Sequence, residues 1–230
     1  MSVWSVLVPA MTLPFLAAWF YFDLFSHHLF SRWLYGATKV FTVLWPVIAV
    51  KLILGEPWPR LSLGWNPHGR ALGLGVATGA SILGLMWLLL QTGVGEVVQQ
   101  SAESIRQKTE ALGVLDHYWA FGCFIAFMHS LIEEYYWRWF VYGQLRHLVA
   151  QGAAHVAAGL AFAAHHIIVT TQYFPLALGV SLGLVVGVGG MIWSWMYERQ
   201  GTLAGAWISH ALVDLGILSV GHKLLFNTWI

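Results

Sequence analysis

Residues 118–142 read YWAFGCFIAFMHSLIEEYYWRWFVY, a membrane-length run that is apolar except for charges near its middle. Glu133, Glu134 and Arg138 lie close together within it. A charged side chain at the centre of a bilayer costs about 2.5–3.5 kcal/mol on insertion scales. Charges at this depth therefore indicate a polar site that is built inside a helical membrane protein.

The composition of the whole chain supports this class. The 230 residues are 58% hydrophobic and only 9% charged, and the mean hydropathy is +0.68. So few charges are untypical of a water-exposed surface. Apolar runs of about 20 residues match the hydrocarbon core, and are too long for barrel strands. The sequence thus predicts an all-α, polytopic transmembrane helical bundle with about seven to eight membrane helices.

Apolar segments and their connections outline a single domain, residues 1–230. Residues 1–91 are expected to form N-terminal helices without a motif, and residues 117–220 a motif-bearing core. The first segment lacks a basic start and a small-residue cleavage site, which favours a retained helix. The segments expected to cross the membrane are Val3–Phe22, Trp33–Leu54, Leu72–Leu90, Tyr118–Tyr142, Ala153–Thr171, Leu176–Tyr197 and Leu203–Val220.

Three polar or mixed stretches are expected at the membrane surface. Gly55–Arg70 contains several prolines and predicts an interfacial loop, and Gly95–Leu115 predicts a helix lying on the membrane. Trp229 in the C-terminal tail is an expected interfacial anchor. Lysines and arginines divide almost evenly between the two sides, which only slightly favours an N-terminus inside. Cys123 is the only cysteine, so disulfides and thiolate metal clusters within one chain are excluded.

Two further polar points lie in later apolar segments, at His165-His166 and at His210 with Asp214. Turns are expected near Gln151-Gly152 and near residues 199–201. With a rise of 1.5 Å per residue, Glu133 and His166 reach similar depths, and His210 lies about 13 Å beyond its turn. We therefore expect these groups to meet in one polar cavity that opens to the inner leaflet beside the glycine-rich segment Leu176–Tyr197.

His165 and His129 are expected to have no direct part in catalysis. His165 projects about 100° away from His166 on the same helix, so it is expected to be a packing residue. His129 lies one helical turn before Glu133 on the same face, so it is expected to support that carboxylate.

At this point the chain resembles a known family. Its three motifs stand in the order found in the CPBP family, the CAAX-protease and bacteriocin-processing proteins, also called Abi-type glutamic intramembrane endopeptidases. The similarity covers about Tyr118–Val220. The motif residues are Glu133-Glu134-x-x-x-Arg138, Phe162-x-x-x-His166 and His210-x-x-x-Asp214.

The resemblance implies a role for each motif residue. Glu133 matches the general base, which works with His166 on a water molecule, and His210 and Asp214 match the positions that stabilise the oxyanion. Asn is frequent in the family at the position of Asp214. An ionised Asp only accepts hydrogen bonds, so Asp214 would either orient His210 or donate as a neutral acid. The supporting positions are Glu134, Arg138 and Phe162.

The function implied by the resemblance is that of a metal-independent glutamic intramembrane endopeptidase with no cofactor. It would cut near the terminus of a membrane-associated protein or peptide, as in sorting-signal removal, peptide maturation or CAAX-like processing. The expected partners are this substrate and the lipid bilayer, with no nucleic acid. The expected location is a bacterial inner (plasma) membrane.

Two alternatives remain open. A zinc-dependent membrane protease would use Glu133, Glu134, His166 and His210 as ligands, although no H-E-x-x-H motif is present. A non-catalytic immunity or scaffold protein would keep the same fold.

Overall fold

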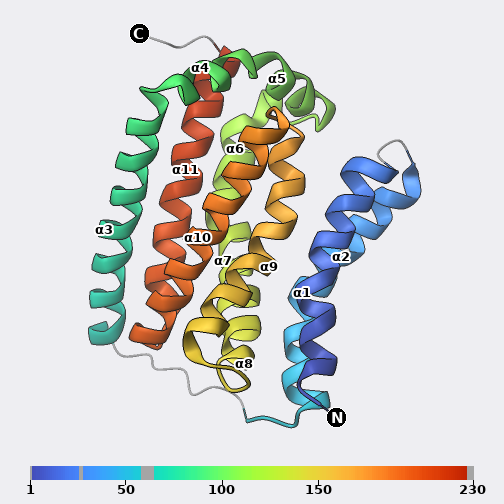
Figure 1. Ribbon diagram of the computed structural model, residues 1–230, viewed down its shortest axis with the longest axis vertical. Coiled ribbons are helices and arrows are strands. Elements are labelled where there is room, and N and C mark those ends of the chain that lie inside the picture. The colour runs from blue at the N-terminus through green and yellow to red at the C-terminus, as the bar shows by residue number, and fades with distance from the viewer. Residues whose placement is uncertain (1, 26–27, 58–64, 227–230) are drawn as a thin grey trace.

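The computed structural model describes residues 2–25, 28–57 and 65–226, and every regular element within them is a helix. Most helices run along the long axis of the molecule, while α4 and α5 lie across one end (Figure 1). Six described helices are long and apolar enough to cross a membrane, or seven if one bent pair counts as a span. The predicted fold, a polytopic transmembrane helical bundle, is confirmed.

The N-terminal part consists of three long helices. α1 (Trp4–Trp19) and α2 (Leu29–Val47) each continue into a π-helical turn, η1 (Phe20–Leu24) and η2 (Ile48–Ile53). α3 (Trp65–Leu90) packs along α11, whereas α1 packs along α9. These packing partners attach the N-terminal helices to the C-terminal half of the chain.

The prediction of an interfacial loop over Gly55–Arg70 is wrong for the second part of that range, because α3 already begins at Trp65. Pro67 lies in the first turn of this helix, where a missing N–H breaks no intrahelical hydrogen bond. Residues 58–64 of that stretch, and the predicted anchor Trp229, lie outside the described residues.

The predicted surface segment forms two short helices rather than one. Ser101 alone separates α4 (Gly93–Gln100) from α5 (Ala102–Ala111). The side-chain oxygen of Thr92 caps α4 by accepting a hydrogen bond from the backbone N–H of Val94. Arg106 on α5 donates to the backbone carbonyl of Leu225, which fixes this layer to the end of the bundle.

The helix that carries the glutamates alternates between π-helical and α-helical turns. Its parts are α6 (Tyr118–Cys123), η4 (Phe124–His129), α7 (Ser130–Glu134), η5 (Tyr135–Tyr142) and α8 (Gly143–Leu145). A π-helical turn has i→i+5 hydrogen bonds and often occurs at functional sites. Here two π-helical stretches flank the single short α-helical segment that bears both glutamates.

Three regular helices complete the bundle: α9 (Gln151–Thr171), α10 (Leu176–Gln200) and α11 (Ala204–Phe226). The turn predicted near Gln151-Gly152 lies directly before these residues, at residues 146–150, and Gln151 begins α9. The second predicted turn is correct. Gly201 ends α10 with φ of 65°, a left-handed conformation that glycine adopts without steric cost.

Helices α9 and α10 share the most extensive contact in the molecule, and they run side by side in Figure 1. Glycines on α10 let the backbones approach closely. A Cβ atom on Gly183 would lie 2.7 Å from the Cα of Ile167, and one on Gly187 would lie 2.7 Å from the Cβ of Ala163. Small residues at such a contact are typical of packed membrane helices.

The close approach of α9 and α10 leads to a prediction about stability. Gly183→Ala is expected to lower the free energy of unfolding by about 1–3 kcal/mol, because the added methyl group forces two backbones apart. Gly84→Ala in α3 is the matched control, since a Cβ there meets nothing within 4 Å. Thermal unfolding in detergent measures both variants. Equal midpoints for Gly183→Ala and Gly84→Ala would contradict the close packing.

Candidate active site

Two consecutive buried carboxylates on α7 define the centre of the site. Glu133 and Glu134 are 8% and 0% exposed, respectively. They point to different partners: Glu133 faces histidines of α9 and α11, while Glu134 lies between Arg138 and His210. The two carboxylates therefore serve different purposes although they are neighbours in sequence.

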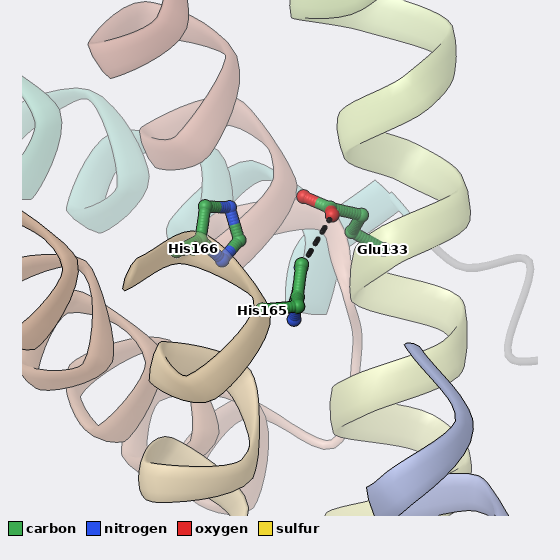
Figure 2. Close-up of side chains that lie close together, drawn as sticks. All are labelled: Glu133, His165 and His166. Carbon is green, nitrogen blue, oxygen red and sulfur yellow. Dashed lines mark ion pairs between the residues drawn. The ribbon is translucent and has the colours of Figure 1, made fainter. Parts of the chain in front are cut away.

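Four imidazole rings surround the Glu133 carboxylate. The Nε2 atom of His165 lies 3.6 Å from Oε1, and the Nε2 atom of His210 lies 3.7 Å from Oε2. The Nδ1 atom of His129 lies 3.9 Å from Oε2. Glu133, His165 and His166 each present one ligand atom within 4.8 Å of the others (Figure 2). The structure thus brings the predicted residues Glu133, His166 and His210 together.

The position of His165 differs from the sequence-based expectation of a packing residue. Its ring stacks on Trp137 with 5.5 Å between ring centroids, and Nε2 points to Glu133. Both histidines of α9 approach the same carboxylate in Figure 2. Two residues 100° apart on one helix can flank a group that faces the helix between them. This is why His165 reaches the site as well.

One hydrogen bond determines the tautomer of His166. Its Nδ1 atom lies 2.9 Å from the backbone carbonyl oxygen of Phe162, one turn earlier on α9. A carbonyl oxygen only accepts, so Nδ1 carries the proton and the neutral ring keeps a lone pair on Nε2. A neutral His166 is therefore able to accept a proton or a hydrogen bond at Nε2.

His210 is held by Glu134, a contact that the sequence did not predict. Its Nδ1 atom lies 2.8 Å from Oε1 of Glu134, so Nδ1–H donates to that carboxylate. The ring also stacks on Trp193, with 4.1 Å between centroids. These two contacts direct Nε2 toward Glu133 and toward Asp214, whose Oδ1 atom is 3.7 Å away. Asp214 thus lies at Nε2, while the orienting contact at Nδ1 comes from Glu134.

Arg138 provides the positive charge opposite Glu134. Its NH1 atom lies 3.2 Å from Oε1 of Glu134, and both side chains are buried. The guanidinium carbon lies 4.4 Å from the ring centroid of Phe162 and 5.0 Å from that of Trp193. A cation at this distance from an aromatic face is attracted to the ring quadrupole. Glu134 and Arg138, one helical turn apart, thus form a buried ion pair, and Phe162 contacts both Arg138 and His166.

One set of side chains could also hold a metal ion. Glu133, His165 and His166 are the only such set among the described residues. Carboxylate and imidazole groups are common zinc ligands, with metal–ligand bonds of about 2.0–2.2 Å. Of the zinc ligands proposed from the sequence, Glu134 and His210 lie outside this set. They are bonded to each other through Nδ1 of His210.

The arrangement has the parts that hydrolysis requires. A carboxylate next to a free imidazole lone pair can hold a water molecule and take its proton. An imidazole N–H on the other side can donate to an oxygen atom that becomes negative. Glu133, with His166 and His210 beside it, offers a carboxylate and imidazole groups of these kinds.

Comparison with known proteins finds one family that is similar to this part of the chain. The model of the family described as type II CAAX prenyl endopeptidase Rce1-like matches residues 115–216. Neither a search of curated proteins nor a search of solved structures found a match. The matched residues include all three motifs, and the resemblance inferred from them is confirmed: residues 115–216 of this integral, multi-pass membrane protein match the Rce1-like type II CAAX prenyl endopeptidase family.

Proposed function

We propose that this chain is a metal-independent glutamic intramembrane endopeptidase. The observation that carries the proposal is the buried Glu133 carboxylate, which faces His165 and His166 on one helix and His210 on another. The family match supports a peptidase. The geometry supports Glu133 as the base because several nitrogen donors and acceptors surround its two oxygens.

In the first step, Glu133 and the Nε2 lone pair of His166 hold a water molecule. Glu133 removes one proton from the water molecule. At the same time, the oxygen of this water molecule attacks the carbonyl carbon of the substrate peptide bond. The new C–O bond turns the carbonyl oxygen into an oxyanion. An N–H of His210 at Nε2 donates a hydrogen bond to it, which requires that the ring be protonated on both nitrogens.

In the second step, the tetrahedral intermediate collapses and the C–N bond breaks. The Glu133 carboxylic acid gives its proton to the departing nitrogen, so that a free amine and a free carboxylic acid result. Glu133 is then ionised again and ready for the next water molecule. Acid–base catalysis of this kind contributes typically 10²–10⁴-fold to the rate.

Asp214 is proposed to act on the ring of His210. Its Oδ1 atom lies 3.7 Å from Nε2, and Glu134 accepts from Nδ1 at 2.8 Å. The two carboxylates face the two nitrogens of one ring, and an imidazolium donates from both nitrogens. Asp214 therefore stabilises the doubly protonated ring that the oxyanion needs.

The substrate is proposed to be a membrane-associated protein or peptide that is cut near its terminus. The site lies within membrane-spanning helices, so a substrate anchored in the same bilayer reaches it without leaving the lipid. Sorting-signal removal, peptide maturation and CAAX-like processing all present such a segment. The proposed location is a bacterial inner membrane.

Cleavage itself can be tested with purified protein in lipid vesicles. A library of peptides anchored at one end by a lipid or an apolar helix is incubated with the protein, and mass spectrometry detects the products. We expect one new amine and one new carboxylic acid per cut. An absence of products across the library, with the protein correctly folded, would favour the non-catalytic immunity or scaffold alternative.

A zinc protease is the second candidate, because Glu133, His165 and His166 form a possible ligand set. Prolonged chelation is expected to leave the turnover of the purified protein unchanged, since Glu133 itself supplies the base. Elemental analysis is expected to find less than stoichiometric metal. Loss of activity on chelation, with recovery on adding Zn²⁺, would replace the proposal by the zinc mechanism.

A further inference from the structure

Helix α2 brings a lysine next to the site, although it lies outside the matched residues 115–216. The Nζ atom of Lys39 is 3.1 Å from Nε2 of His129. It also lies 5.1 Å from the ring centroid of Tyr35, on the same helix. His129 in turn presents Nδ1 to Oε2 of Glu133 at 3.9 Å. A chain of three groups thus connects the N-terminal helices with the proposed base.

The donors and acceptors between Lys39, His129 and Glu133 follow from the chemistry of the lysine ammonium. A lysine ammonium has three N–H donors and no acceptor, so Nε2 of His129 must offer a lone pair. The neutral ring then carries its proton on Nδ1, and Nδ1 is the atom that faces Glu133. A proton on Nε2 instead would place an N–H donor against the ammonium.

Pairing with a carboxylate does not explain the position of the ammonium. Among the described residues, no carboxylate lies within 4.0 Å of Lys39. A lysine in a membrane-spanning segment is expensive unless it is paired or reaches water. Lys39 is exposed, and its Nζ atom is bonded to a site histidine.

We propose that Lys39 is a positioning residue, which acts through His129 to keep an N–H directed at Glu133. The proposal rests on the proposed role of Glu133 as base. The other groups that face this carboxylate are His165 and His166 from α9 and His210 from α11. Within the described parts of the chain, His129 is the one member of this group that is bonded to a residue from the N-terminal helices.

Steady-state kinetics of Lys39→Met test the proposal. We expect kcat to fall about tenfold and KM to stay within about twofold, because small misplacements of a catalytic group can cost up to about 100-fold. Lys39→Arg keeps an N–H donor and is expected to recover most of the loss. Lys51→Met is the matched control: it removes a lysine from the following π-helical turn, where Nζ donates to the carbonyl of Glu56. Equal losses for Lys39→Met and Lys51→Met would overturn the proposal.

A double-mutant cycle shows whether Lys39 acts through His129. His129→Leu is expected to lower kcat by a similar factor, and adding Lys39→Met to it is expected to cost nothing further. Mutations of residues that act as one unit are non-additive. If the two losses multiply, Lys39 acts independently of His129 and the proposal is wrong.

A spectroscopic measurement keeps the inference separate from the proposed function. The chain has 11 histidines, and comparison with a His129→Gln spectrum assigns His129 in protein labelled with ¹⁵N-histidine. We expect a protonated Nδ1 in the wild type and a mixture of tautomers in Lys39→Met. An unchanged His129 signal in Lys39→Met would overturn the inference, whether or not the protein cleaves peptides. Failure of cleavage with the expected signals would overturn only the proposed function.

Discussion

Glu133→Gln is expected to lower the turnover of peptide cleavage by at least about 100-fold, within the range for loss of a general base. Glutamine has nearly the same size as glutamate, so the packing around the buried side chain is retained. Its amide cannot remove a proton from water at neutral pH. The measurement is kcat of purified, folded protein in lipid vesicles, with products quantified by mass spectrometry.

Glu96→Gln is the matched control for this experiment, because Glu96 is exposed on α4. It removes the same charge from a position that is outside the site, and its turnover is expected to equal that of the wild type. A folded Glu133→Gln protein with near-normal turnover would show that Glu133 is not the base. The mechanism proposed above would then be abandoned.

The second large effect is on stability. Glu134→Gln removes the charge that balances buried Arg138 and weakens the acceptor of His210 Nδ1. Removal of one partner of a buried ion pair typically costs about 3–5 kcal/mol, since the other charge stays buried without compensation. We expect a correspondingly lower midpoint of thermal unfolding in detergent, and reduced yield of folded protein.

A double variant distinguishes charge imbalance from other causes. Glu134→Gln with Arg138→Met removes both charges, and replacing a buried pair by apolar groups is often close to neutral. The double variant is therefore expected to be more stable than Glu134→Gln alone. If the double variant is the less stable of the two, the pair does not work as a mutually compensating unit.

The membrane helices could be predicted from the sequence because the length of an apolar run depends directly on bilayer thickness. The start of α3 was missed because Asn66-Pro67 indicated a loop, whereas proline is tolerated in the first turn of a helix. The break between α4 and α5 was missed as well. Local composition does not distinguish one surface helix from two at Ser101.

The depth of the site residues could also be predicted, because the rise per residue of a helix is nearly constant. Glu133, His166 and His210 meet as expected. The rotation of each helix about its axis depends on packing against neighbouring helices, so it cannot be predicted from the spacing of residues in the sequence. For this reason His165 was expected elsewhere, and the contacts of Glu134 with His210 and of Lys39 with His129 were not foreseen.

The π-helical turns around the glutamates have a consequence for how this helix can change over evolution. A π-helical turn is equivalent to one extra residue accommodated within an α-helix. A deletion in Tyr135–Tyr142 can therefore be absorbed by converting the π-helical turn back to an α-helical turn, without breaking the helix. Residues before the deletion, including Glu133 and Glu134, would keep their positions on the helix. Side chains after the deletion would point in the same directions as they did before it. Relatives with the same catalytic residues are thus free to differ in length by one residue here, and an ungapped alignment through this helix would misplace one side of it.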